Sequence, residues 1–166
     1  QENSEVLAKV SSSFINHAQA SINLNREIPE NISFDELVEE GKLVWNNELS
    51  KIKVTSQESE KTNEDLIKFY SSLYRTILFP RQFHEYDLDN NQIHYSPYDG
   101  NIYDGPLYTD NGFWDTFRAV FPFYSLVYPE KLGEIIQGIM VNPYLESGWL
   151  PEWSSPGHRD LSLIHI

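Results

Sequence analysis

The chain contains no cysteine, and basic residues are scarce, since 12 Lys and Arg stand against 25 Asp and Glu in 166 residues. The absence of cysteine excludes a disulfide framework and a Cys–His nucleophile pair. A formal net charge of −13 opposes nucleic-acid binding, which needs a basic surface, and favours a neutral ligand, a cation or a metal. No run of 18 apolar residues occurs, so no segment predicts a helix that spans a membrane.

Aromatic residues, by contrast, make up 14% of the sequence, which indicates either a large core or surfaces on which a ligand stacks. Two clusters stand out, Trp114-Asp115-Thr116-Phe117-Arg118 and Gly148-Trp149-Leu150-Pro151-Glu152-Trp153. Together they place flat aromatic faces beside carboxylates and a guanidinium. Such faces cover the apolar side of a sugar ring, and the charged groups bond its hydroxyls.

The spacing of apolar residues predicts a mainly helical domain. A capping box, Ser33-Phe34-Asp35-Glu36, opens the first helix, and Pro80 ends the second. Pro129 suits the first turn of a helix, whereas Pro122 and Pro143 are expected to kink or disturb the helices that contain them. The four predicted helices span residues 33–52, 62–79, 113–128 and 129–146.

The segments outside these helices carry other signals. Residues 1–20 have strand-like composition, and a lone strand needs partners from outside the chain. Residues 21–32 contain Asn, Pro and charges, which predicts a connector, and a short strand is expected over 51–55. Residues 80–112 form a long segment rich in tyrosine. Such long loops are usually functional or disordered, and the aromatic content argues against disorder.

The first aromatic cluster predicts a polar clamp if its residues are helical. Trp114 and Arg118 are then on one face, and Asp115 and Arg118 are close enough to pair and to keep each other charged. The alternative is an ordinary surface ion pair beside a tryptophan that belongs to the core. The three residues alone favour that alternative, and the second cluster shifts the balance towards a binding surface.

In the second cluster, Trp149 and Trp153 flank a rigid, proline-containing segment and are costly to leave bare in water. They either pack beneath the loop or line a pocket, and both interpretations stay open. Glu152 lies between them in sequence. It either bonds a ligand hydroxyl or simply faces solvent.

The beginning of a calcium loop is suggested by Asp87, Asp89 and Asn91. The match fails afterwards, because Gln92 stands where the loop needs glycine and Tyr98 where it needs glutamate. A hydrated turn is the simpler interpretation. No phosphate-binding loop or nucleophile elbow is present, and the histidines show no metal-ligand spacing, namely His84, His94 and His158.

The two aromatic clusters, together with Phe79-Pro80-Arg81 and the helix that starts at Pro129-Glu130, closely resemble glycoside hydrolase family 92. This is a family of exo-acting α-mannosidases that need calcium, and the resemblance runs from about residue 5 to 160. It implies an (α/α)6 barrel catalytic domain preceded by an N-terminal β-sandwich domain. Residues 1–20 then match the last strand of the sandwich, 21–32 the linker, and 33–160 the N-terminal part of the barrel.

The resemblance also implies an inverting mechanism, in which one carboxylic acid protonates the glycosidic oxygen while another carboxylate activates water. The family's acid, base and main calcium ligands lie downstream of the second cluster. No catalytic or metal-binding residue is therefore assigned here, and the chain alone is expected to be inactive. The residues that carry over bind substrate: Trp114, Asp115 and Arg118 match the subsite for terminal mannose, and Trp149 and Trp153 match its rim.

The expected partners are mannose-containing glycans, the expected cofactor is Ca2+, and the resemblance implies an exported enzyme, secreted or periplasmic. Two other interpretations stay open. One is a non-catalytic carbohydrate-binding or interaction module, and the other is a different glycosidase with a helical barrel. The resemblance ends after Gly157-His158-Arg159-Asp160, so residues 161–166 are expected to be a non-native tail.

Overall fold

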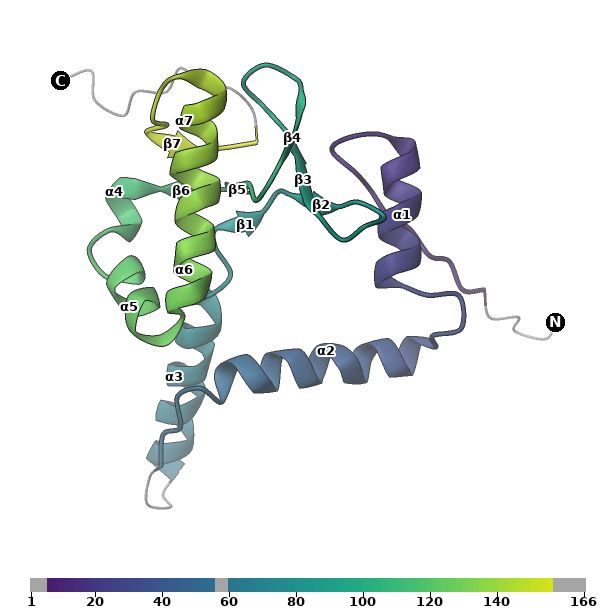
Figure 1. The fold of residues 1–166 in the computed structure, drawn as a ribbon. Coiled ribbons are helices and arrows are strands. Elements are labelled where there is room, and N and C mark those ends of the chain that lie inside the picture. The colour runs from purple at the N-terminus through teal and green to yellow at the C-terminus, as the bar shows by residue number, and fades with distance from the viewer. Residues whose placement is uncertain (1–5, 56–59, 157–166) are drawn as a thin grey trace.

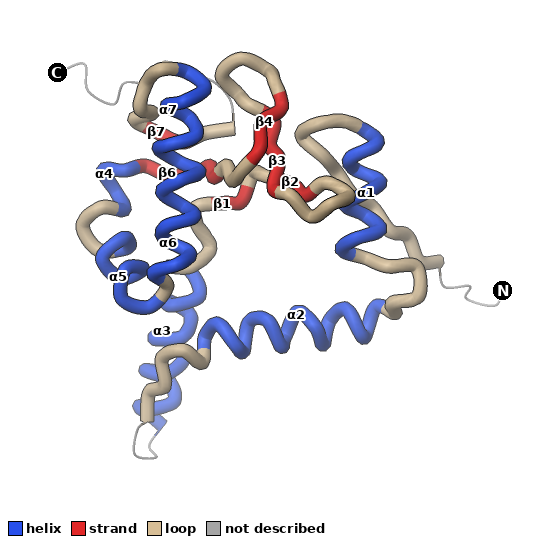
Figure 2. The backbone as a smooth tube through the Cα atoms, in the orientation of Figure 1, coloured by secondary structure: helices blue, strands red, loops and turns tan. Residues whose placement is uncertain are grey.

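The computed structural model describes residues 6–55 and 60–156, which form a mainly helical fold with short strands, as expected (Figure 1). Figure 2 shows β2, β3 and β4 between α1 on one side and the stretch α6–α7 on the other. Within these ranges no helix is both long and apolar enough to cross a membrane. The elements are α1 (His17–Glu27), α2 (Phe34–Leu49), α3 (Glu60–Thr76), β1 (Arg81–Gln82), β2 (Glu85–Tyr86), β3 (Gln92–Tyr95), β4 (Ile102–Asp104), β5 (Tyr108–Thr109), β6 (Asn111–Gly112), α4 (Phe113–Thr116), α5 (Val120–Val127), α6 (Pro129–Ile136), the π-helical turn η1 (Gln137–Val141), α7 (Asn142–Ser147) and β7 (Trp153–Ser154).

The N-terminal segment differs from the expectation. Residues 6–16 form no strand, and the expected connector is largely helix α1, which the side chain of Asn16 caps. The segment docks instead through the buried carboxylate of Glu85 on β2, whose charge is compensated by three hydrogen-bond donors. These donors are Ser13 Oγ, Phe14 N and Asn23 Nδ2.

Helices α2 and α3 confirm the first two predicted helices. The capping box of α2 is complete, since Ser33 Oγ accepts a bond from Glu36 N and the Glu36 carboxylate accepts one from Ser33 N. The predicted strand over 51–55 is absent, because that segment is part of the turn from α2 towards α3. The two helices meet where the ring of Trp45 lies 4.6 Å from that of Tyr74.

The aromatic segment 80–112 is ordered and contains short antiparallel strands. β2, β3 and β4 form one sheet in that order, while β1 pairs with β5 and β6 with β7. Asp87 turns the chain between β2 and β3, because its carboxylate accepts bonds from Asp89 N at 2.9 Å and Asn91 N at 2.8 Å. Hydrogen bonds from Asn91 lower the pKa of Asp87. The residues that resembled a calcium loop thus form a hairpin turn, as the simpler interpretation predicted.

The core lies where α5, α6 and η1 pack with β5, and its buried members are Tyr108, Tyr124, Ile135 and Ile139. Pro129 opens α6 as predicted, but the predicted third helix is divided into α4 and α5. Pro122 explains the division, because its ring conflicts with a helical carbonyl four residues earlier, at Arg118. Pro143 does not end its helix, since the π-helical turn η1 precedes it and α7 continues to Ser147.

A buried polar network joins this strand region to α6. His84, with a fully buried side chain, faces Leu107 O through Nδ1 at 3.2 Å and Gln92 Nε2 through Nε2 at 3.1 Å. Gln92 also donates to Glu134 Oε1 at 3.0 Å, and Leu107 N lies 3.3 Å from His84 Nδ1. Burial lowers the pKa of His84. Burial alone would raise the pKa of Glu134, but the hydrogen bonds it accepts, first from Lys131, lower that pKa overall.

Two glycines of the same helical stretch test the packing of the core. A β-carbon on Gly138 would lie 2.8 Å from Tyr108 Cδ2 and 3.1 Å from Pro106 O, whereas one on Gly133 would meet nothing within 4 Å. We expect Gly138→Ala to lower the free energy of unfolding by about 1–3 kcal/mol. Gly133→Ala should raise it by about 0.5–1 kcal/mol. Urea unfolding followed by circular dichroism measures both, and equal effects of the two substitutions would contradict the packing.

Candidate functional site

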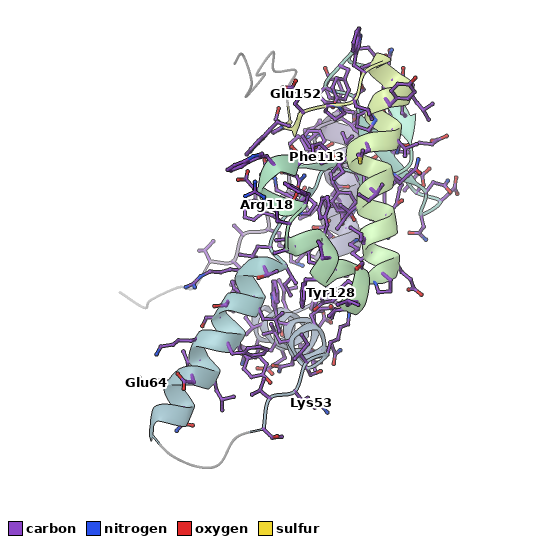
Figure 3. The ribbon with its side chains drawn as sticks, turned by 90° about the vertical axis from the view of Figure 1, so that its left-hand side faces the viewer. Lys53, Glu64, Phe113, Arg118, Tyr128 and Glu152 are labelled. Atoms are coloured by element: carbon purple, nitrogen blue, oxygen red, sulfur yellow. The ribbon has the colours of Figure 1, made fainter. Side chains whose placement is uncertain are left out.

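The two aromatic clusters, far apart in sequence, meet through the pairing of β6 with β7. In this antiparallel ladder Gly112 lies opposite Trp153. Helix α4 follows β6 directly, so the first cluster begins at the end of the ladder. Figure 3 shows Glu152, Phe113 and Arg118 one after another along the same flank of the stretch α6–α7. The candidate sugar-binding surface is therefore assembled by main-chain pairing.

Trp153 and Asp115 pack together over Gly112. A β-carbon on Gly112 would collide with the ring of Trp153, whose Cε3 atom is 2.8 Å from that position, and would lie 2.5 Å from Asp115 Oδ2. The missing side chain thus admits both groups to one place. Asp115 is exposed and Trp153 is partly buried, so a carboxylate and an indole edge stand side by side at the surface.

The expected clamp forms only in part. The guanidinium of Arg118 lies 5.0 Å from the ring centroid of Trp114 and 5.2 Å from that of Phe117. Trp114 is 63% exposed, so it is not a core tryptophan. The expected pairing with Asp115 is wrong, because Arg118 forms no ion pair with any residue that the structure describes. The physical reason is that Pro122 breaks the helix before it reaches Arg118, which removes the helical spacing.

The second cluster is divided between the site and the open surface. Trp149 is 81% exposed, and Glu152 also faces solvent. Gly148 turns the chain at the end of α7 in the left-handed conformation, with φ of 78°. The structure therefore brings Trp153 to Asp115 and leaves Trp149 at the outer edge of the loop.

Three residues in or near the ladder, Gly112, Asn111 and Thr109, were not among the site residues predicted from the sequence. An isolated glycine in a strand marks a close approach, so Gly112 carried a usable signal. No sequence signal distinguishes Asn111 and Thr109, which are 2% and 1% exposed. The amide atoms of Asn111 and the hydroxyl of Thr109 have no hydrogen-bond partner within residues 6–55 and 60–156. Both residues are buried and lie within three positions of Gly112 in the chain.

Within residues 6–55 and 60–156, no group of three or more His, Cys, Asp or Glu residues is placed to hold a metal ion. His84 and His94 are buried and bonded within the fold. His158, like the expected tail at 161–166, lies outside the described residues.

Tryptophans, a carboxylate and a guanidinium on one flank of a helical domain suit a carbohydrate ligand, and comparison with known proteins defines the class as glycoside hydrolases. The catalytic-domain profile of glycosyl hydrolase family 92 matches residues 19–163. The chain therefore belongs to this family, as its sequence motifs indicated.

Two solved structures are similar to this chain. A family GH92 inverting mannosidase from Bacteroides thetaiotaomicron VPI-5482 has a TM-score of 0.81 and 49% sequence identity, over 90% of this chain and 20% of that one. The gh92 family glycosyl hydrolase ccman5 has a TM-score of 0.64 and 23% identity, over 76% of this chain and 16% of that one, and this likeness shows the fold alone. No curated protein matches the chain. The chain spans about a fifth of the length of the Bacteroides mannosidase.

The ladder geometry predicts that Gly112→Ala separates Trp153 from Asp115. The backbone at this position, with φ of −96°, accepts alanine, but the added methyl group overlaps the indole. We expect the indole N–H signal of Trp153 to shift in NMR spectra and the free energy of unfolding to fall by about 1–3 kcal/mol. The signal of Trp45, on α2, should stay in place. Gly41→Ala is the control, because nothing lies within 4 Å of its β-carbon, and an unmoved Trp153 signal in Gly112→Ala would contradict the geometry.

Proposed function

We propose that this chain is the sugar-binding part of a mannosidase that removes terminal α-linked mannose from glycans by a calcium-dependent inverting mechanism. The observation that carries the proposal is the meeting of Trp153 with Asp115 across Gly112, in a chain of this family. The 49% identity to an inverting mannosidase supports mannose as the sugar. Because the chain spans 20% of that protein, the activity belongs to a longer enzyme of which this chain supplies one part.

Each group of the site has a task in this proposal. The rings of Trp153 and Trp114 cover the apolar side of the terminal sugar. Asp115 accepts hydrogen bonds from its hydroxyls, and Arg118, held over Trp114, donates to its oxygens. Hydrogen bonds to charged groups contribute about 1.5–3 kcal/mol each. Trp149, at the outer edge, is placed to contact the next part of a glycan.

Inversion needs an acid and a base, two carboxyl groups about 6.5–9.5 Å apart that admit a water molecule between them and the sugar. We assign neither to this chain, and the described residues supply no calcium ligand set. In the proposed enzyme these groups come from outside the chain. The task of the chain is to bind and orient the sugar, and the isolated chain is inactive.

We also propose that these helices begin an (α/α)6 barrel that follows a β-sandwich domain, in an exported enzyme, secreted or periplasmic. Helix α2 supports the barrel, because it contains no buried residue although it is amphipathic. Leu43 and Val44 on this helix are 62% and 60% exposed. Apolar side chains of this kind suit contact with further helices.

A hybrid enzyme tests the proposed activity. Residues 19–156 of this chain replace the matching segment of the Bacteroides mannosidase, and sugar release from a panel of glycosides is measured with calcium and after chelation. We expect calcium-dependent release of mannose from the hybrid and none from the isolated chain. Binding of mannosides without release would favour the non-catalytic module. Release of another sugar would favour a different glycosidase.

Asp115→Ala in the hybrid enzyme should lower kcat/KM by roughly 10- to 150-fold, the equivalent of one lost hydrogen bond between a charged group and a sugar hydroxyl. Because Asp115 is exposed, the melting temperature should change little. Asp104→Ala, at an exposed position of β4, is the matched control and should leave kcat/KM unchanged. Activity of Asp115→Ala within a few-fold of the unsubstituted hybrid would show that Asp115 is structural.

A further inference from the structure

A buried histidine connects the central strand β3 to the helix that leads into the site. The side chains of His94, on β3, and Glu146, on α7, are 0% and 4% exposed. His94 Nε2 lies 2.7 Å from Glu146 Oε1, and His94 Nδ1 lies 2.8 Å from Gly105 O. The same strand is held to α6 by the bond from Gln92 to Glu134. β3 is therefore bonded to both α6 and α7.

In the His94–Glu146 pair, each side chain needs the other as a hydrogen-bond partner. Gly105 O can only accept, so His94 Nδ1 carries a hydrogen. The contact between Nε2 and Oε1 needs one more proton, either on the imidazole, which gives an ion pair, or on the carboxyl group. Glu146 Oε2 has no partner in the described part of the chain, so His94 is the hydrogen-bond partner of this carboxyl group. Loss of either side chain would leave a buried polar group unbonded.

Glu146 stands in the last turn of α7, directly before the loop of the second aromatic cluster. Gly148 turns the chain after this helix, and Trp153 then enters β7 opposite Gly112. The orientation of α7 sets where the loop begins, and the β6–β7 ladder sets where it ends. A two-residue ladder is short, so the other end of the loop also needs a fixed position.

We infer that the His94–Glu146 pair is a positioning element of the sugar-binding surface, which fixes the end of α7 and, through the loop, the place of Trp153 beside Asp115. The inference rests on the proposed function, because its consequence is a sugar contact. Both residues act through Trp153 and are positioning residues. Buried ion pairs contribute little net stability compared with apolar side chains of similar size, which is consistent with a role in geometry.

Substitutions of Glu146 test the inference with two readouts. The first is the indole N–H signal of Trp153 in the chain, with Trp45 as an internal reference. The second is KM against kcat for a mannoside in the hybrid enzyme. We expect Glu146→Ala to move the Trp153 signal and to raise KM about tenfold with little change in kcat, because the lost contact serves ground and transition states alike. Glu146→Gln should restore both readouts to within about twofold, since its amide can donate to a neutral His94.

Tyr124→Phe separates positioning from stability. It removes hydrogen bonds to Thr76 O and Phe79 O on the far side of the core, so it should lower the melting temperature without moving the Trp153 signal or KM. If Glu146→Ala leaves both readouts unchanged, or if Tyr124→Phe changes them equally, the inference is overturned.

Glu146→Asp covers the case in which Glu146→Ala does not fold. It keeps the carboxyl group but withdraws it by one methylene, and it should move both readouts in the same direction as Glu146→Ala. No movement in this variant would also overturn the inference. Failure of the unsubstituted hybrid to release mannose would count against the proposed function, and the NMR readout would still decide the inference.

Discussion

The site depends on one short piece of main-chain pairing, in which Gly112 of β6 lies opposite Trp153 of β7. Hydrogen bonds of a ladder fix which residues stand opposite each other, and the glycine lets the indole approach the backbone closely enough to reach Asp115. No single helix carries the surface. Its parts come from the start of α4 and from the loop after α7, so the orientation of both helices becomes part of the binding geometry.

The parts of the fold that follow from local physics were readable in the sequence. The capping box at Ser33 and the proline at 129 placed two helix starts correctly, because capping and proline geometry act within one turn. Helix α1 was missed, since it is short and polar and is held by a distant carboxylate, Glu85. The two aromatic clusters of the candidate site stood out as motifs in the sequence, but the packing partner of Asp115 did not. A break caused by Pro122 and a strand pairing between distant segments decided that partner, and neither leaves a periodic signal.

Some of the acidic residues hold parts of the fold together rather than only facing solvent. Three buried or partly buried glutamates form hydrogen bonds that hold separate segments together: Glu85 holds the N-terminal segment, Glu134 the strand region, and Glu146 the strand β3. Each is matched by donors rather than left to repel its neighbours, which is the condition for burying a carboxylate. The net charge argued against nucleic acid as a partner, but it did not reveal how many of the carboxylates are structural.

The π-helical turn η1 sets the rotational phase of the stretch α6–α7. In a regular α-helix, positions 134 and 146 would point about 120° apart around the axis. Asn142 N bonds instead to Gln137 O, five residues back, and this wider turn rotates the following residues back towards the side that Glu134 occupies. Both glutamates thereby face β3. Loss of one residue from this turn would swing the start of the aromatic loop around the helix axis, so chain length here is constrained even where residue identity is not.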